Sequence, residues 1–246
     1  MKKIYLFLIL SIFSCNIFAL NEFVADYKLY VDNIKVATET RKLNFYGDKY
    51  EYISNANTTG IAKLFGDISI EAKSIFTLND AGINSEKYSI KETKDGELTR
   101  SYIIDIYPSD KKIISGVTST NPNLTTFKTE GGNILDPLSL FIALSNDLKN
   151  QPNKIIFSYQ VADGKYLKSN EYKKMTNQTL MINGNEEHVI RVKEFNSEGN
   201  MSAFFSPKHL YLPVIMEQNK NGHNHRYEIT GLKFKEENSE ELQIIF

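Results

Sequence analysis

Hydrophobic and polar residues alternate with a period of two along most of the chain. The alternation is clear over 23–31 and longest over 68–78, where every second residue from Ile68 to Phe76 is apolar or small. This period places alternate side chains on opposite faces of an extended chain, so each run predicts a half-buried β-strand. Further extended runs cover 34–45, 83–92 and 97–107. Asp95-Gly96 separates the last two and predicts a hairpin turn between antiparallel strands.

The second half of the chain shows the same strand pattern, interrupted about every twenty residues by turn sequences. Strand-like sequence resumes at 154–161, and the turn sequences are Asp163-Gly164, Asn183-Gly184, 197–199 and Asn221-Gly222. This rhythm is typical of long hairpins and makes a meander the simplest topology. Leu242, Ile244 and Phe246 share one parity at the end of the chain, which predicts a last strand paired back into the sheet.

One segment has helical rather than strand periodicity. Asp136-Pro137 is a helix start, because an aspartate caps free amides of the first turn and a proline there has no amide to lose. Apolar positions then recur at helical spacing from Leu138 through Phe141 to Leu148, so the helix should lie on the sheet or plug the mouth of a barrel. A loop rich in Thr, Asn and Gly, at 116–133, precedes it. The predicted fold is therefore mainly β, a strongly curved antiparallel sheet or barrel-like meander with one central α-helix at about 136–148.

The first nineteen residues resemble an export signal. Lys2 and Lys3 precede an apolar run over 4–13 and a small residue at Ala19, which predicts a signal peptide over 1–19 and a single β-rich periplasmic domain over 20–246. In the alternative reading, Cys15 is the acylated first residue of a membrane-anchored lipoprotein. No transmembrane span is expected, because no later segment approaches twenty apolar residues.

Charge and composition exclude several partners. The chain has 29 basic and 30 acidic residues, a formal charge of -1, so there is no basic field to hold nucleic acid. It has a single cysteine, Cys15, which signal cleavage would remove together with any disulfide chemistry. Fourteen tyrosines and fifteen phenylalanines supply all the aromatic surface, since there is no tryptophan. They could line an apolar cavity or form ordinary cross-strand pairs.

Motifs for catalysis and cofactors are not evident. The sequence has no Gly-rich phosphate loop, no nucleophile elbow and no His-Glu-x-x-His pair, so no catalytic residue and no cofactor is predicted. His223 and His225 would share one strand face and could begin a metal site with Glu217 or Glu228. Because they adjoin the Asn221-Gly222 turn, we interpret them as solvated residues of a hairpin tip and predict no metal.

The remaining polar candidates have structural interpretations. His188 and His209 have no serine or cysteine partner in a recognisable triad motif. Asp163 leads an Asp-Gly turn, and Asp136 is a helix cap. An enzyme is therefore the third choice, and a cluster of Asp, His and Tyr converging in a cleft would favour it.

Three segments together resemble an uncharacterised family of exported bacterial proteins, catalogued as domain of unknown function 3108. They are the strand 27–30 with 60–62 further on, the segment 136–144 with the sequence Asp-Pro-Leu-Ser at its start, and Ser206-Pro207 followed by 212–214. The resemblance implies a curved or barrel-like antiparallel sheet with a central helix in the envelope of a Gram-negative bacterium. It supplies no reaction. The residues that it marks as structural are Asp136, Pro137, Ser139, Pro207 and Pro213.

Two functions follow from these expectations. The first is a non-enzymatic periplasmic protein that binds or escorts a hydrophobic, lipid-like ligand on a concave sheet. The second is an envelope scaffold or assembly factor that acts through its surface and holds no ligand. The residues expected to line the ligand site in the first case are Tyr27, Leu29, Ile68, Ile70, Phe76, Leu138 and Phe141.

Overall fold

The computed structural model describes residues 20–107, 110–117, 125–129, 132–164, 166–195, 200–235 and 242–244. The predicted signal at 1–19 with Cys15, the turn at 197–199 and Phe246 lie outside these residues. Within them the protein is mainly β, with one α-helix, as the sequence predicts.

Most of the chain belongs to one sheet. Its first eight strands are β1 (Phe23–Val31), β2 (Ile34–Tyr46), β3 (Lys49–Thr58), β4 (Ile68–Asn79), β5 (Gly82–Lys94), β6 (Glu97–Tyr107), β7 (Lys112–Val117) and β8 (Thr125–Lys128). The other eight are β9 (Ile134–Leu135), β10 (Ile156–Ala162), β11 (Leu167–Ile182), β12 (Asn185–Phe195), β13 (Asn200–Ser206), β14 (Leu212–Lys220), β15 (His223–Lys235) and β16 (Leu242–Ile244).

The sheet consists of two meanders that meet in its middle. The strand order runs from β8 back to β1, then from β15 back to β9, and β16 pairs with β15 outside this path. The two halves are joined because β1 pairs antiparallel with β15 along its whole length. β9 pairs in parallel with β10, and the other pairings described are antiparallel. Residues far apart in sequence therefore form the centre of the sheet.

The predicted turns are where the chain reverses. At Asp95-Gly96, Asn183-Gly184 and Asn221-Gly222, both turn residues have positive φ angles, between 49° and 85°. Two-residue hairpin turns of this kind match the twist of the flanking strands, and they favour Asn or Asp followed by Gly. The turn sequences thus set the hairpin register that the alternation alone leaves open.

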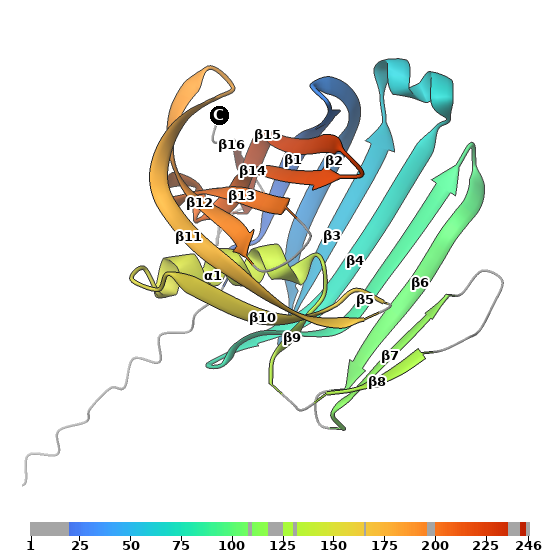
Figure 1. Ribbon diagram of the computed structural model, residues 1–246, viewed down its shortest axis with the longest axis vertical. Coiled ribbons are helices and arrows are strands. Elements are labelled where there is room, and N and C mark those ends of the chain that lie inside the picture. The colour runs from blue at the N-terminus through green and yellow to red at the C-terminus, as the bar shows by residue number, and fades with distance from the viewer. Residues whose placement is uncertain are drawn as a thin grey trace, which may run out of the picture.

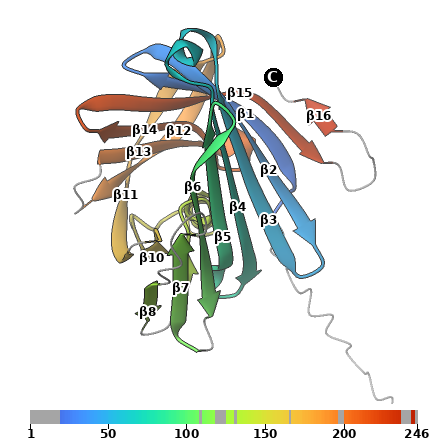
Figure 2. The ribbon, with the colours of Figure 1, turned by 90° about the vertical axis from the view of Figure 1, so that its right-hand side faces the viewer.

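The sheet curls around the helix without closing (Figures 1 and 2). Its β9 end approaches β5, since the Ile134 amide donates to Asn84 Oδ1 at 3.0 Å and Asn133 Nδ2 donates to the Ala81 carbonyl at 2.6 Å. The β10–β11 turn approaches β6, where a side chain at Gly164 would lie 2.8 Å from the Tyr102 ring. Side chains and loops therefore connect the two arms of the curl.

The helix α1 (Ser139–Asn150) starts a few residues later than the predicted start at 136. Pro137 and Leu138 form a turn, yet Asp136 still acts as the cap: its Oδ1 accepts the amides of Leu138 at 2.8 Å and Ser139 at 3.0 Å. Its Oδ2 accepts the hydroxyls of Ser74 and Ser85, at 2.5 and 2.7 Å. Asp136 therefore also anchors the start of the helix to β4 and β5.

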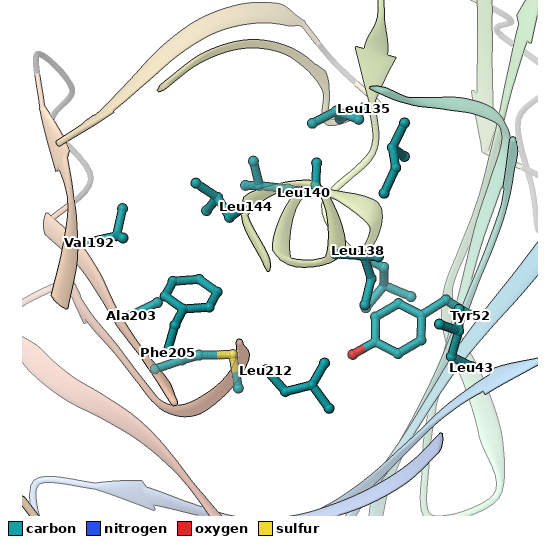
Figure 3. Close-up of a cluster of buried hydrophobic side chains, with 14 of the residues drawn as sticks. Leu43, Tyr52, Leu135, Leu138, Leu140, Leu144, Val192, Ala203, Phe205 and Leu212 are labelled. Carbon is teal, nitrogen blue, oxygen red and sulfur yellow. The ribbon is translucent and has the colours of Figure 1, made fainter. Parts of the chain in front are cut away.

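The core lies between α1 and the two arms of the sheet (Figure 3). Leu140 and Leu144 of the helix face a wall formed by Val192, Ala203 and Phe205 on one side. Leu138 faces the opposite wall, which carries Leu43 and Tyr52. All eight side chains are buried. The predicted apolar stripe of the helix thus packs on the concave face of the sheet.

Three segments differ from the prediction. β7 was not among the predicted strands, and its last two residues lie in the predicted loop at 116–133. The same loop contains the short edge strand β8, whose four residues are too few to show an alternation. The connection between β3 and β4 contains a 3-10 helix, η1 (Gly60–Phe65), which has no buried residue and hence no hydrophobic periodicity to reveal it. In the part of the chain described, no helix is long and apolar enough to cross a bilayer.

Candidate functional site

The concave face of the sheet changes from packed to partly open along its strands. On β1, the inward positions Phe23, Ala25 and Tyr27 are buried, but the next inward position, Leu29, is only half-buried. On β4, Phe76 is fully buried at one end, whereas Ile70 and Ile68 on the same face are half-buried. The helix therefore covers one half of the concave face and leaves apolar side chains partly accessible on the other half.

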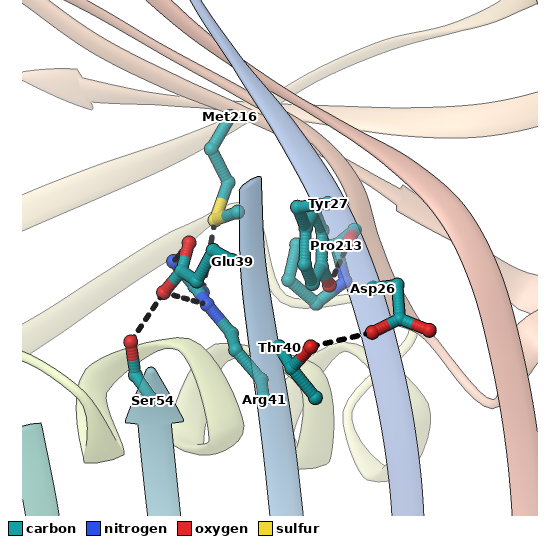
Figure 4. A network of polar contacts seen from close by, with 8 residues as sticks. All are labelled: Asp26, Tyr27, Glu39, Thr40, Arg41, Ser54, Pro213 and Met216. Carbon is teal, nitrogen blue, oxygen red and sulfur yellow. Dashed lines mark hydrogen bonds and ion pairs between the residues drawn. The ribbon is translucent and has the colours of Figure 1, made fainter. Parts of the chain in front are cut away.

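A buried ion pair marks the boundary between the two halves. Glu39 and Arg41 lie on the inward face of β2, and both are 5% exposed. Arg41 Nε donates to Glu39 Oε1 at 2.8 Å, and Arg41 Nη2 donates to Glu39 Oε2 at 3.1 Å (Figure 4). Ser54 on β3 donates to Glu39 Oε1 at 2.5 Å. This bidentate pair satisfies the carboxylate well but leaves one side of the guanidinium for other groups.

Aromatic rings and a thioether surround the rest of the guanidinium. Arg41 Cζ lies 5.0 Å from the ring centroid of Tyr27, 5.5 Å from that of Phe141 and 5.7 Å from that of Tyr227. Such stacking favours a cation. Arg41 Nη1 donates to Met216 Sδ on β14, at 3.3 Å. A thioether is a weak acceptor, so this N–H group has the poorest partner in the network.

The charge of Arg41 is held by its environment. Burial alone would lower the pKa of Arg41, but the facing Glu39 carboxylate and the Tyr52 and Tyr27 hydroxyls raise it well above its ordinary value. Burial also raises the pKa of Tyr27, which donates its hydroxyl to the Pro213 carbonyl at 2.8 Å and stays neutral. Arg41 is therefore a fixed cation that is paired with the Glu39 carboxylate on one side and surrounded by aromatic rings and a thioether on the other.

The strand register places the open half next to this cation. Tyr27, Glu39, Ala56 and Ile70 form one row across β1, β2, β3 and β4. Ile70 is thus two strands from Glu39, or about 10 Å at the usual strand spacing. Leu29 lies in the next row outward, about 7 Å further along the strands. Arg41 lies one row further inward than Glu39, in the row of Ala25, Ser54 and Ala72.

The expected lining residues thus occupy different surroundings. Tyr27 and Phe141 contact Arg41, and Leu29, Ile68 and Ile70 lie on the partly open half of the concave face. Phe76 and Leu138 are 0% and 7% exposed and belong to the core. The structure brings five of these seven residues to the ion pair or to the surface beyond it.

The histidines near the chain reversals have partners of their own. His223 Nδ1 lies 2.6 Å from Asp32 Oδ2 on the surface, and His188 Nδ1 lies 2.9 Å from Thr179 Oγ1. Glu217 and Glu228 both accept hydrogen bonds from Arg226. Across the described ranges, no group of three or more His, Cys, Asp and Glu side chains could hold a metal ion.

A Ser-Glu-His cluster lies in the other arm of the sheet. Glu187 accepts Ser206 Oγ at 3.1 Å and Lys208 Nζ at 3.0 Å, and it lies 3.1 Å from His209 Nε2. In a catalytic triad the histidine stands between the nucleophile and the acid, whereas here the carboxylate contacts both. Ser206 and His209 are fully buried. We interpret the cluster as the anchor that holds the Pro207 turn against β12.

A second concavity, with a volume of about 890 Å³, lies beside the C-terminal half of α1. Its polar side chains hold the surrounding loops together. Asn79 caps the Ala81 amide, Asn133 donates to the Ala81 carbonyl, and Tyr159 donates to Asp147 at 2.7 Å. Because these groups are already engaged, we place the candidate site at Arg41 rather than here.

The ion pair was missed in the sequence because charged residues are expected on the outer face of a strand. A signal was nevertheless present. Glu39 and Arg41 share their parity with Ala37 and Leu43, all on the inward face of β2. Two opposite charges, two residues apart on an apolar face, are a pattern that predicts a buried pair.

Comparison with known proteins supports the fold. No protein-family model matches the chain, and no curated protein matches it. A solved structure that does match is a beta-barrel-like protein of domain of unknown function DUF1849 from Brucella abortus, with a TM-score of 0.60. The two sequences are 10% identical over 88% of this chain and 99% of that one. At this identity the likeness shows a shared beta-barrel-like fold alone, and that neighbour is itself a protein of unknown function.

Proposed function

We propose that the protein is a non-enzymatic binding module for an amphipathic anion, such as a fatty acid or lysophospholipid. The acyl chain would lie along Leu29, Ile68 and Ile70 on the partly open half of the concave face. The anionic group would accept hydrogen bonds from Arg41, replacing the Met216 thioether at Nη1. The proposal includes one further point: the chain belongs to an exported family of unknown function, as its sequence suggests.

The observation that carries this proposal is the poor partner of a buried cation. A buried guanidinium stabilises a fold only when its hydrogen bonds are good, because desolvation of the charge is costly. Arg41 contacts the Glu39 carboxylate, has the Tyr52 hydroxyl close by and, at Nη1, has a sulfur atom 3.3 Å away. A ligand oxygen would be a stronger, charge-assisted acceptor there. The partly accessible apolar side chains start at Ile70, which lies in the row of the sheet next to that of Arg41.

Location in the periplasm is part of the proposal. Residues 1–19 would direct export and be removed after Ala19, and the binding module would then work between two membranes. N-terminal sequencing of the exported protein tests this step. A chain that starts at Leu20 supports it, and a chain that starts at an acylated Cys15 would place the module on a membrane surface instead.

A titration with oleate tests the binding function. The native protein should bind oleate, and Ile70→Asp should weaken binding at least about tenfold, because a carboxylate in the path of the acyl chain repels the ligand and removes apolar contact. Ser69→Asp is the matched control, since Ser69 is exposed on the opposite face of β4. Equal affinities for the two variants would refute the site. Absence of any oleate binding would leave the envelope scaffold as the better function.

A further inference from the structure

The connection between β3 and β4 presents large apolar side chains to solvent. Ile61, Leu64 and Phe65 of η1 are 61%, 82% and 80% exposed. Ile34, at the start of β2, is 58% exposed. Isolated apolar residues on a surface are ordinary, but adjacent side chains exposed to this degree mark an interaction surface. We refer to Ile34, Ile61, Leu64 and Phe65 as the apolar tip.

The base of the tip is firmly attached to the sheet. The Thr59 amide donates to the Val36 carbonyl at 2.9 Å, and the Ile68 amide donates to Thr58 Oγ1 at 2.9 Å. On the other side, the Asp67 amide donates to Asp95 Oδ1 at 2.8 Å and Asp67 accepts the Asp95 amide at its carbonyl, also at 2.8 Å. The bonds hold both ends of η1, so its apolar side chains point away from a fixed base.

The tip projects beyond the sheet at one end of the molecule (Figures 1 and 2). The tip lies at the partly open end of the concave face. Ile68 is the inward residue of β4 closest to that end, and only two residues separate it from η1. The opposite end of β4 adjoins α1. A ligand that leaves the Arg41 site along Leu29 and Ile70 would therefore emerge beside the tip.

We propose that the apolar tip docks the protein on a lipid bilayer. A projecting tip with apolar side chains and lysines next to them fits the boundary between head groups and acyl chains, where amphipathic segments lie. Lys63 is on η1, where it pairs with Asp67 at 3.3 Å, and Lys35 follows Ile34; both lysines are exposed. The choice of a bilayer over a protein partner rests on the proposed function, since an amphipathic ligand released beside the tip must pass into or out of a membrane.

A tryptophan at the tip tests this proposal directly. The chain contains no tryptophan, so Phe65→Trp introduces a single fluorescent reporter. Vesicles of phosphatidylethanolamine and phosphatidylglycerol (3:1) should shift its emission to the blue, and brominated lipid should quench it. Ile156→Trp is the control, because Ile156 is 48% exposed on β10 and away from the tip. Unchanged emission at position 65, or an equal response at position 156, would overturn the proposal.

Vesicle co-sedimentation gives a second measurement. Leu64→Ser/Phe65→Ser should lower the vesicle partition coefficient at least about tenfold, since each buried Leu or Phe side chain supports a change of this size. Ile155→Ser/Ile156→Ser removes a similar exposed pair and should leave it unchanged. The tip variant should still bind oleate, and Ile70→Asp should still dock, which separates failure of docking from failure of ligand binding. If the tip variant sediments like the native protein, the tip is not the docking surface.

Discussion

Replacement of Asp136 by alanine should be among the most destabilising single changes in the described part of the protein. The carboxylate is fully buried, and its two oxygens accept four hydrogen bonds from Ser74, Ser85 and the amides of Leu138 and Ser139. Loss of a helix cap costs about 1 kcal/mol. Each hydrogen bond between a hydroxyl and a charged group contributes about 1.5–3 kcal/mol.

The expected loss for Asp136→Ala is about 3–5 kcal/mol, less than the simple sum. Burial raises the pKa of Asp136, although Ser74 and the other donors partly offset it, so the carboxylate itself is costly to bury. Asp136→Asn keeps an oxygen for the amides without the charge, and should cost only about 1–2 kcal/mol.

Urea unfolding followed by circular dichroism measures these losses. Combining Asp136→Ala with Ser74→Ala should show a coupling energy of about 1–3 kcal/mol, because the two side chains bond each other directly. If Asp136→Ala costs only about 1 kcal/mol and the cycle shows no coupling, Asp136 is a simple cap and the proposed anchor to β4 and β5 is wrong.

Three further predictions concern stability. Burial alone would raise the pKa of Glu187, but hydrogen bonds from Lys208, His209 and Ser206 lower it below the ordinary 4.5. The stabilisation that Glu187 contributes is therefore present above pH 4.5 and is lost as the pH falls through the lower folded value. Urea unfolding should show that Glu187→Gln loses less stability in acid than the native protein, and identical pH profiles would contradict this. Tyr27→Phe removes a buried bond to the Pro213 carbonyl and should cost about 1–2 kcal/mol in the same assay. Gly164 has a φ of 92°, and the Cβ of an alanine there would lie 2.8 Å from the Tyr102 ring. Gly164→Ala should therefore lower stability by about 1–3 kcal/mol. A neutral effect would show that the β10–β11 turn does not pack closely against β6.

Local sequence patterns predicted the elements of this fold well. Alternation located β1 and β4, because a sheet with one buried face imposes that pattern on a strand. The extended runs at 34–45, 83–92 and 97–107 correspond to β2, β5 and β6. The Asp-Gly and Asn-Gly pairs located hairpins, because their backbone conformations fit only a few turns. The central helix was evident from Asp136-Pro137 and the apolar residues after it.

The arrangement of the elements in space was less predictable. Alternation tells which residues share a face but not which strands meet, so the pairing of β1 with β15 and the approach of β9 to β5 had no local signal. The parity of Glu39 and Arg41 was a local signal for a buried pair, but the groups from β3, β14 and α1 that surround the pair come together only in the folded chain. The tip was missed because η1 packs no side chain into the core.

The most direct test of the binding site compares two ligands with the same hydrocarbon chain, one with an anionic carboxylate and one with a neutral hydroxyl group. Oleate and oleyl alcohol have the same chain, so their affinity ratio reports the contribution of Arg41, and native protein should prefer oleate at least about tenfold, the equivalent of one charge-assisted hydrogen bond. Glu39→Gln/Arg41→Gln removes both charges together and leaves neither one buried alone. Arg226→Gln, at an ion-pair cluster on β15, is the control for loss of a positive charge elsewhere. The double variant should bind both ligands equally, while the control keeps the preference for oleate. An unchanged preference in the double variant would show that Arg41 does not hold the anionic group.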